Sequence, residues 1–291
     1  MKRVRRWFGQ LGQLGPIGIV IGMLIAAAAV GFYLRERRRP MRPRTRRIAF
    51  APLAFDRRHA PATIRVLRAK LAYQRGFCVD QYNGLCIQEL TLERYLRGVV
   101  LAEEGVFLRF AGSNGRIDGA SLARVAEAWK LQAIAARSYA LYAVLVDKYD
   151  RKRNGFDLTD TPRDQAYDDR RHPAVDRAVL STAGRVLVDR RGRLLYAEYS
   201  ASCHSRGTRS LLGNRRIECH RRCRDHAFAG SSHFRGMCQW GSLHFALDGR
   251  PLAWLLAHYY PSATTERVVY RPSVPTPGAR TTGVDPRRKA R

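Results

Sequence analysis

The sequence predicts a mixed α/β domain, of the α+β kind, behind an N-terminal transmembrane helix. Two long helical patterns alternate with shorter segments of strand character, and an uncharged run lies near the N-terminus. Hydrophobic residues make up 45% of the 291 residues, which is enough apolar material for a packed core. The length suits one domain of about 200 residues with appendages.

The first element is the uncharged run 17–34, which has Lys and Arg clusters on both sides. Its length predicts a membrane-spanning helix. We favour a retained anchor, and the small residues 26–29 leave a cleaved signal peptide as the alternative. Taken alone, the positive-inside rule would leave the C-terminal part in the cytoplasm, because more Lys and Arg follow the run than precede it.

The basic charge is concentrated in the flanks. The formal net charge is +29, and more than half of it falls in residues 1–47 and 271–291, which argues against an ordinary acidic or neutral cytosolic enzyme. We expect four parts in chain order: a cytoplasmic basic stub with the transmembrane helix over 1–34, an Arg/Pro-rich stalk over 35–60, the domain over 61–270, and a basic Pro-rich disordered tail over 271–291.

Elements inside the domain follow from the period of the apolar residues. Alternation predicts strands, and a three-to-four spacing predicts helices. The expected elements are a strand over 62–69, helices over 92–104 and 122–148, two strands over 185–189 and 193–201 joined by the turn 190–192, and a last helix from about 240 to 258.

The helix over 92–104 carries the first candidate for chemistry. Thr91 can cap it, and its apolar side continues onto Glu103, while Glu104 is turned about 100° away toward solvent. A carboxyl at the end of an apolar side is partly desolvated, which raises its pKa as a general acid near neutral pH requires. On pattern alone, a frayed helix end reaching water is the commoner explanation.

Arg137 lies between apolar positions of the second helix, which predicts a buried partner. That partner would be an acid or a backbone carbonyl. Without further context, a structural ion pair explains Arg137 better than a binding site does.

Six cysteines fall into two groups. Cys78 and Cys86 enclose the turn signal Asn83-Gly84, which predicts a hairpin-like loop closed by a disulfide, with two unrelated buried thiols as the alternative. The other four lie at 203, 219, 223 and 238 among several histidines. We favour disulfides among these four over a zinc site and over unbonded thiols, because the spacing from 219 to 223 fits no standard zinc knuckle.

Seven segments, taken in order, resemble the SpoIID/LytB family. They are 92–103 (LERYLRGVVLAE), 130–140 (KLQAIAARSYA), 160–167 (DTPRDQAY), 178–188 (AVLSTAGRVLV), 202–203 (SC), 233–241 (HFRGMCQWG) and 258–261 (HYYP). The resemblance covers roughly residues 88–262 and implies one SpoIID/LytB-like domain.

The resemblance also implies an activity. Sporulation members are lytic transglycosylases that cut peptidoglycan glycan strands, and the family's catalytic acid falls on Glu103. Arg137, His233 and Gln239 are then candidates to line the groove and bind substrate. Trp240 could stack on a sugar ring, although a Trp beside Gly is nearly as often part of the core. The chemistry needs no cofactor, but some sporulation members bind zinc near the cleft, which leaves open a zinc site of Cys203, Cys219 and Cys223 with a histidine.

We therefore expect a lytic transglycosylase in the cytoplasmic membrane whose C-terminal domain lies in the periplasm, because peptidoglycan occurs only outside that membrane. Its expected partners are glycan strands and the membrane. LytB members are named as enhancers of a cell-wall amidase, so the alternative is a non-catalytic wall-binding protein with an amidase partner. Arg-rich nucleic-acid binding is a remote alternative, since the sequence contains no recognised module for it and no nucleic acid is expected.

Two departures from the family pattern adjoin the expected site. Glu104-Gly105 stands where the family usually continues Met-Pro, and about a dozen extra residues follow around 106–120. With Phe107, Arg109 and Phe110, this insertion is expected either to cover the substrate as a lid or to block the groove. Ser200 replaces a family histidine, so any role of that histidine must be supplied elsewhere or is lost.

Overall fold

The computed structural model describes residues 51–113, 116–203, 206–213, 215–226 and 233–271. The chain divides into two units, residues 1–44 and 45–291, and all described residues belong to the second. The expected transmembrane helix, the first half of the stalk and the tail beyond residue 271 lie outside the described residues. Within the described residues, none of the helices combines the length and the apolar character needed to span a membrane.

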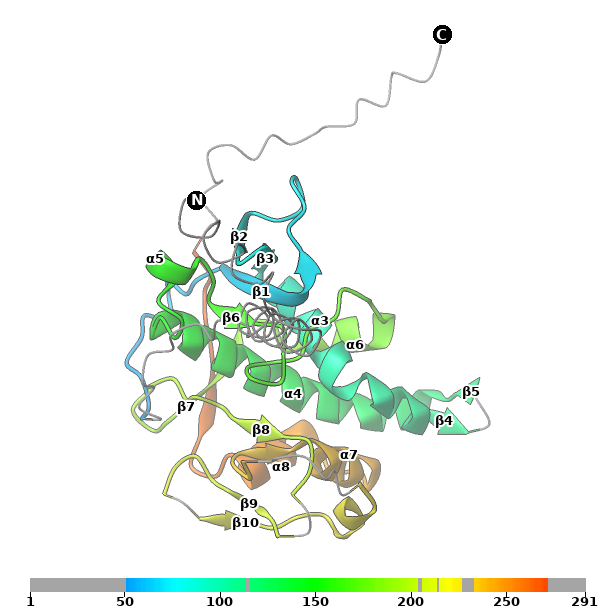
Figure 1. Cartoon of the computed structure of the whole chain (residues 1–291). Helices are drawn as coiled ribbons and strands as arrows, with labels where there is room; N and C mark the ends of the chain where they lie inside the picture. Colours follow the sequence, from blue (N-terminus) through cyan, green and yellow to red (C-terminus); the bar gives the residue numbers. More distant parts are fainter. Residues whose placement is uncertain (1–50, 114–115, 204–205, 214, 227–232, 272–291) are drawn as a thin grey trace, which may run out of the picture. The chain divides into compact units, whose positions relative to one another are not determined.

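The described part is a mixture of helices and strands, as expected (Figure 1). The helices are α3 (Leu92–Glu104), η2 (Gly105–Phe110, 3-10), α4 (Gly119–Leu145), α5 (Arg151–Asn154), α6 (Pro173–Ser181), η3 (Arg221–His226, 3-10), α7 (Gln239–Leu247) and α8 (Leu252–Tyr259). The strands are β1 (Thr63–Ala72), β2 (Asp80–Tyr82), β3 (Leu85–Thr91), β4 (Gly112–Ser113), β5 (Arg116–Ile117), β6 (Leu158–Thr159), β7 (Arg185–Val188), β8 (Tyr199–Ser200), β9 (Thr208–Arg209), β10 (Arg216–Ile217), β11 (Met237–Cys238) and β12 (Thr264–Arg267).

The largest sheet has the strand order β2-β3-β1-β6. β1 pairs antiparallel with β3, with Val66 opposite Gln88, and parallel with β6. Ile64 and Val66 are two residues apart and both are fully buried in the main core, as the alternation of a strand with one covered face requires. The predicted strand over 62–69 is therefore confirmed.

Helix α4 forms the centre of the core. Asp118 caps its start by accepting the backbone N–H of Ser121 at 2.7 Å. Every residue from 131 to 143 is buried, which is typical of a helix with neighbours on all sides. Figure 1 shows the β1 sheet on one side of α4 and helices α7 and α8 on the other, and α4 contacts α3, α6, α7 and α8.

Two expected elements are wrong in extent. The strand over 193–201 is reduced to β8. The expected turn at 190–192 does bring its two sides together, because the Asp189 N–H donates to the Arg193 carbonyl oxygen at 2.9 Å and the Leu195 N–H to the Leu187 carbonyl oxygen at 3.0 Å. However, β7 also pairs with β12, and Leu194 also exchanges two backbone hydrogen bonds with Leu53. The helix over 240–258 is split into α7 and α8. Gly249 adopts φ +86°, and Pro251 precedes α8, so the chain turns between them.

The disulfide between Cys78 and Cys86 is present, with 5.4 Å between the two Cα atoms. Asn83 and Gly84 form the turn between β2 and β3, both at positive φ. The predicted pairing and its turn are thus confirmed.

Candidate active site

A cavity of about 340 Å³ opens beside the C-terminal end of α3. Its walls come from the end of α3, the middle of α4, the loop before Gln165, the segment around β8 and the start of α7. The lining residues are Glu103, Tyr139, Pro162, Arg163, Asp164, Tyr196, Glu198, Tyr199, Ser200, Ala201, His233 and Gln239.

Glu103 lies half-buried at the cavity, in the last turn of α3. Its Oε1 accepts the backbone N–H of Ala166 at 2.8 Å, and its Oε2 accepts the side-chain N–H of Gln239 at 3.2 Å. Burial raises the pKa of Glu103 above its ordinary value, and these two hydrogen bonds oppose the rise. The carboxyl therefore has access to the cavity and a pKa that burial raises.

Gly98 explains why the loop that carries Ala166 can reach Glu103. A Cβ at this position of α3 would lie 2.4 Å from the carbonyl oxygen of Asp168 and 2.3 Å from the ring of Tyr167. Without one, the loop lies directly against the helix, and the Asp168 N–H donates to the Gly98 carbonyl oxygen at 3.3 Å. The contact sets the position of the Ala166 N–H next to the carboxyl.

Two other carboxyl groups line the cavity, and each faces a cation. Asp164 is paired with Lys148 and also accepts the Tyr149 hydroxyl at 2.8 Å. Glu198 accepts the Arg235 guanidinium at 2.6 Å. Asp164 and Glu198 are thus held in ion pairs, whereas the hydrogen bonds to Glu103 come from neutral N–H groups.

Three tyrosines form much of the wall. Tyr139 and Tyr196 are stacked with ring centroids 4.5 Å apart, and the Tyr199 hydroxyl accepts the side-chain N–H of Gln165 at 3.0 Å. Neither these rings nor Glu198 were among the predicted site residues. The spacing of Tyr196, Glu198 and Ser200 by two residues could have placed them on one side of an extended segment.

His233 and Gln239 line the cavity, as the resemblance implied. His233 Nδ1 accepts the backbone N–H of Arg235 at 3.2 Å and lies 3.4 Å from the Ser200 hydroxyl oxygen. Desolvation of the ring lowers the pKa of His233, so the imidazole tends to be neutral. His233 thus brings an imidazole beside the position where Ser200 replaces the family histidine.

Residues 118–188 match the family model of SpoIID, the stage II sporulation protein. This part of the chain is similar to SpoIID. The match runs from the start of α4 to the end of β7 and confirms the resemblance over that range. It includes Tyr139, Arg163 and Asp164 of the cavity wall. No curated protein matches the chain in a sequence comparison.

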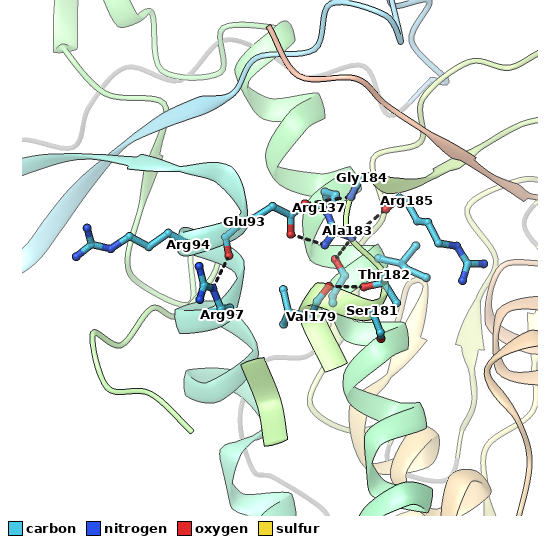
Figure 2. Close-up of polar contacts among 12 residues, drawn as sticks. Glu93, Arg94, Arg97, Arg137, Val179, Ser181, Thr182, Ala183, Gly184 and Arg185 are labelled. Atoms are coloured by element: carbon cyan, nitrogen blue, oxygen red, sulfur yellow. Dashed lines mark hydrogen bonds and ion pairs between the residues drawn. The ribbon is translucent and has the colours of Figure 1, made fainter. Parts of the chain in front are cut away.

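Arg137, in the SpoIID-like part, does not line the cavity. Its side chain is fully buried, and it donates two hydrogen bonds of 2.8 Å to the carboxylate of Glu93 and one of 3.0 Å to the Arg185 carbonyl (Figure 2). Burial alone would raise the pKa of Glu93, but the guanidinium holds it below its ordinary value. Arg137 therefore forms the structural ion pair that the sequence left open, and it joins α3 to α4.

Trp240 is also outside the cavity wall, with 9% of its surface exposed. The rings of Phe107 and Phe110 pack against it with centroids 5.1 and 5.9 Å away. Both belong to the insertion after α3, so that insertion covers Trp240, and none of its described residues lines the cavity.

The expectation that Glu104 faces solvent is wrong. Its side chain is fully buried, and neither carboxyl oxygen has a hydrogen-bond partner among the described residues. The insertion folds back as the 3-10 helix η2. The indole N–H of Trp129 in α4 donates to the Glu104 backbone carbonyl at 3.2 Å, so α4 covers this side of α3. Burial raises the pKa of Glu104 well above its ordinary value.

The expected metal ligands Cys203, Cys219 and Cys223 do meet, and Cys238 joins them in place of a histidine. Their four sulfur atoms lie within 4.8 Å of one another. The structure joins Cys203 to Cys219 as a disulfide. The neighbouring His220 is directed elsewhere, because its Nε2 lies 2.9 Å from the Asp248 carboxylate.

Proposed function

We propose that this protein is a lytic transglycosylase that cuts peptidoglycan glycan strands with Glu103 as both acid and base. The observation that carries this proposal is the setting of Glu103. Among the three carboxyl groups that line the cavity, Glu103 meets two neutral N–H donors, while Asp164 and Glu198 each meet a cation. The similarity of residues 118–188 to a stage II sporulation protein supports a cell-wall substrate.

The chemistry requires one carboxyl. Neutral Glu103 donates its proton to the glycosidic oxygen between MurNAc and GlcNAc, and the bond electrons leave with that oxygen as an oxocarbenium-like centre develops. The Glu103 carboxylate then takes the proton of the MurNAc 6-hydroxyl, whose oxygen bonds to the anomeric carbon. The product is a 1,6-anhydro end, and Glu103 is again neutral. No second carboxylate acts as nucleophile or base, unlike in ordinary glycosidases.

Gln239 suits both states of this carboxyl. An amide carries two donors and an acceptor, so it donates to the Glu103 carboxylate and, after rotation of its end group, accepts from the neutral acid. Tyr199, the most exposed of the three wall tyrosines, is the ring that is available to a sugar. Arg163, exposed in the cavity wall, offers a guanidinium to the carboxylates of stem peptides.

We also propose that the protein is anchored in the cytoplasmic membrane by the run 17–34, with its domain on the periplasmic side. The Cys78–Cys86 disulfide supports an oxidising compartment.

Digestion of isolated sacculi and of peptide-free glycan by the purified full chain, with mass spectrometry of the products, tests the proposed reaction. We expect anhydro-MurNAc ends. Reducing MurNAc ends would instead indicate a hydrolase. Intact glycan that nevertheless binds the protein would favour the non-catalytic amidase enhancer.

A further inference from the structure

The loop that joins β1 to β2, residues 73–79, displays apolar side chains to solvent, and we call it the apolar loop. Tyr73, Phe77 and Val79 are 41%, 46% and 51% exposed. In the described part of the chain, five other large hydrophobic side chains are exposed, and they are spread over residues 106–269. Single exposed apolar residues are ordinary on a protein surface, whereas three within seven residues mark a contact site.

The apolar loop is held in one shape by its own bonds. The Cys78–Cys86 disulfide ties it to β3, and the Cys78 N–H donates to the Gln74 carbonyl oxygen at 2.9 Å. Where the loop enters β2, the Val79 N–H donates to the Ile87 carbonyl oxygen at 2.9 Å. Because the backbone is already ordered, burying its side chains against another surface costs little conformational entropy.

Helix α5 lies beside the same strands. The ring of Tyr82, at the end of β2, packs edge-on against the ring of Phe156, which follows α5, with 5.3 Å between the centroids. Arg65 of β1 donates to the Gly155 carbonyl oxygen at 3.2 Å. Figure 1 shows α5 and the apolar loop at the same, upper end of the domain.

This end of the domain is basic. Residues 70–84 and 147–155 together hold six Lys and Arg against three Asp and no Glu. The exposed basic side chains among them are Lys70, Arg75, Lys152 and Arg153. Exposed aromatic and aliphatic side chains surrounded by basic groups are complementary to a bilayer surface with anionic lipid headgroups.

The length of the preceding chain keeps the domain within reach of a membrane. The proposed anchor ends at residue 34, and the described residues begin at 51. Residues 35–50 can span at most about 55 Å even when fully extended. A domain tethered this closely meets the bilayer at a high effective concentration, so a contact of modest area is enough to hold it there.

We propose that the apolar loop inserts Tyr73, Phe77 and Val79 into the surface of the membrane that holds the anchor, with the basic side chains around it on anionic headgroups. The contact presupposes the proposed anchor and is independent of the proposed cleavage. Neither the apolar loop nor α5 contributes a residue to the cavity wall, so the membrane contact is separate from the site.

Tryptophan fluorescence of the full chain in vesicles tests this contact. Phe77→Trp places a reporter in the apolar loop, and Leu180→Trp is the matched control, because Leu180 on α6 is also 51% exposed. The vesicles contain phosphatidylcholine and phosphatidylglycerol, with or without bromine on the acyl chains. Bromine should quench at least about half of the emission that Phe77→Trp adds to that of the natural chain, and none of the emission that Leu180→Trp adds.

The basic side chains are tested in the same vesicles. Adding Lys70→Glu and Arg75→Glu to Phe77→Trp should reduce the quenching, and so should the removal of phosphatidylglycerol from the vesicles. Quenching that responds to neither change would contradict the contact between basic side chains and headgroups.

Alkaline carbonate separates a failure of the loop from a failure of the anchor. A Phe77→Trp chain that resists extraction and whose added emission bromine does not quench would overturn the loop contact alone. This result is also the one expected if a protein, a glycan or a second copy of the chain covers the loop instead. A chain that carbonate extracts from the vesicles would overturn the anchor and the loop contact together.

Discussion

Glu103 and Glu104 show how two adjacent carboxyl groups acquire different properties. Burial raises the pKa of both. Glu103 has two neutral hydrogen-bond donors and access to a cavity, while Glu104 has no hydrogen-bond partner among the described residues and no exposure. Only Glu103 can therefore exchange a proton with a bound molecule, although the two share a helix end.

The pH dependence of cleavage should respond to Gln239. The acid form of Glu103 starts the proposed reaction, so kcat/KM should fall as pH rises through its raised pKa. The Gln239 hydrogen bond lowers that pKa, so Gln239→Ala should move the falling limb to higher pH. A pH–rate profile of both proteins measures the shift, and a limb that stays in place or moves to lower pH would contradict it.

Glu104→Leu should stabilise the fold at neutral pH. The unfolded chain ionises Glu104 near pH 4.5, whereas the folded chain keeps it neutral, so the free energy of unfolding of the natural chain falls as pH rises above 4.5. Removing an unpartnered buried carboxyl should raise that free energy by about 1–3 kcal/mol at pH 8. Urea unfolding should show a smaller gain at pH 5, and a gain that shrinks with rising pH would refute this explanation.

At the scale of elements, α3 and α4 make the framework of the site. Glu93 and Arg137 join the two helices (Figure 2). Gly98 lets the loop with Ala166 lie on α3. The helix over 92–104 was predictable because its cap Thr91 and its apolar spacing are local features of the sequence. The helix expected over 122–148 lies at Gly119–Leu145, because its cap Asp118 was not recognised in the sequence. The pairing of β7 with Leu194 was predictable from the turn 190–192, whereas the pairing of Leu194 with Leu53 and of β7 with β12 was not, because these partners are remote in sequence.

Arg137→Met should destabilise the fold strongly. It leaves the half-buried Glu93 carboxylate without its cation, and breaking such a pair costs roughly 3–5 kcal/mol. The double variant Glu93→Met/Arg137→Met should recover part of the loss, because no unpaired charge remains. Denaturant unfolding of the three proteins measures both effects. A loss well below 1 kcal/mol in the single variant would show that the pair contributes little.

At the scale of the whole molecule, the cavity is assembled from residues far apart in the chain. Family resemblance brought Glu103, His233 and Gln239 into one expected groove, and the cavity contains all three. The resemblance also placed Arg137 and Trp240 in this groove. Arg137 instead forms the ion pair with Glu93, and Trp240 lies under the insertion. The local sequence had indicated a buried ion pair for Arg137 and core packing as the alternative for Trp240, but it could not name Glu93 or the insertion as their partners, because these lie elsewhere in the chain.

The central claim is that Glu103 supplies the proton for glycan cleavage, and its most direct test compares two neighbouring variants. The natural chain, Glu103→Gln and Glu104→Gln are each incubated with peptide-free glycan, and anhydro-MurNAc ends are counted by mass spectrometry. The natural chain and Glu104→Gln should both form these ends, while Glu103→Gln, with its fold intact by circular dichroism, should lose at least about 10²-fold in rate. Undiminished cleavage by Glu103→Gln would contradict the claim.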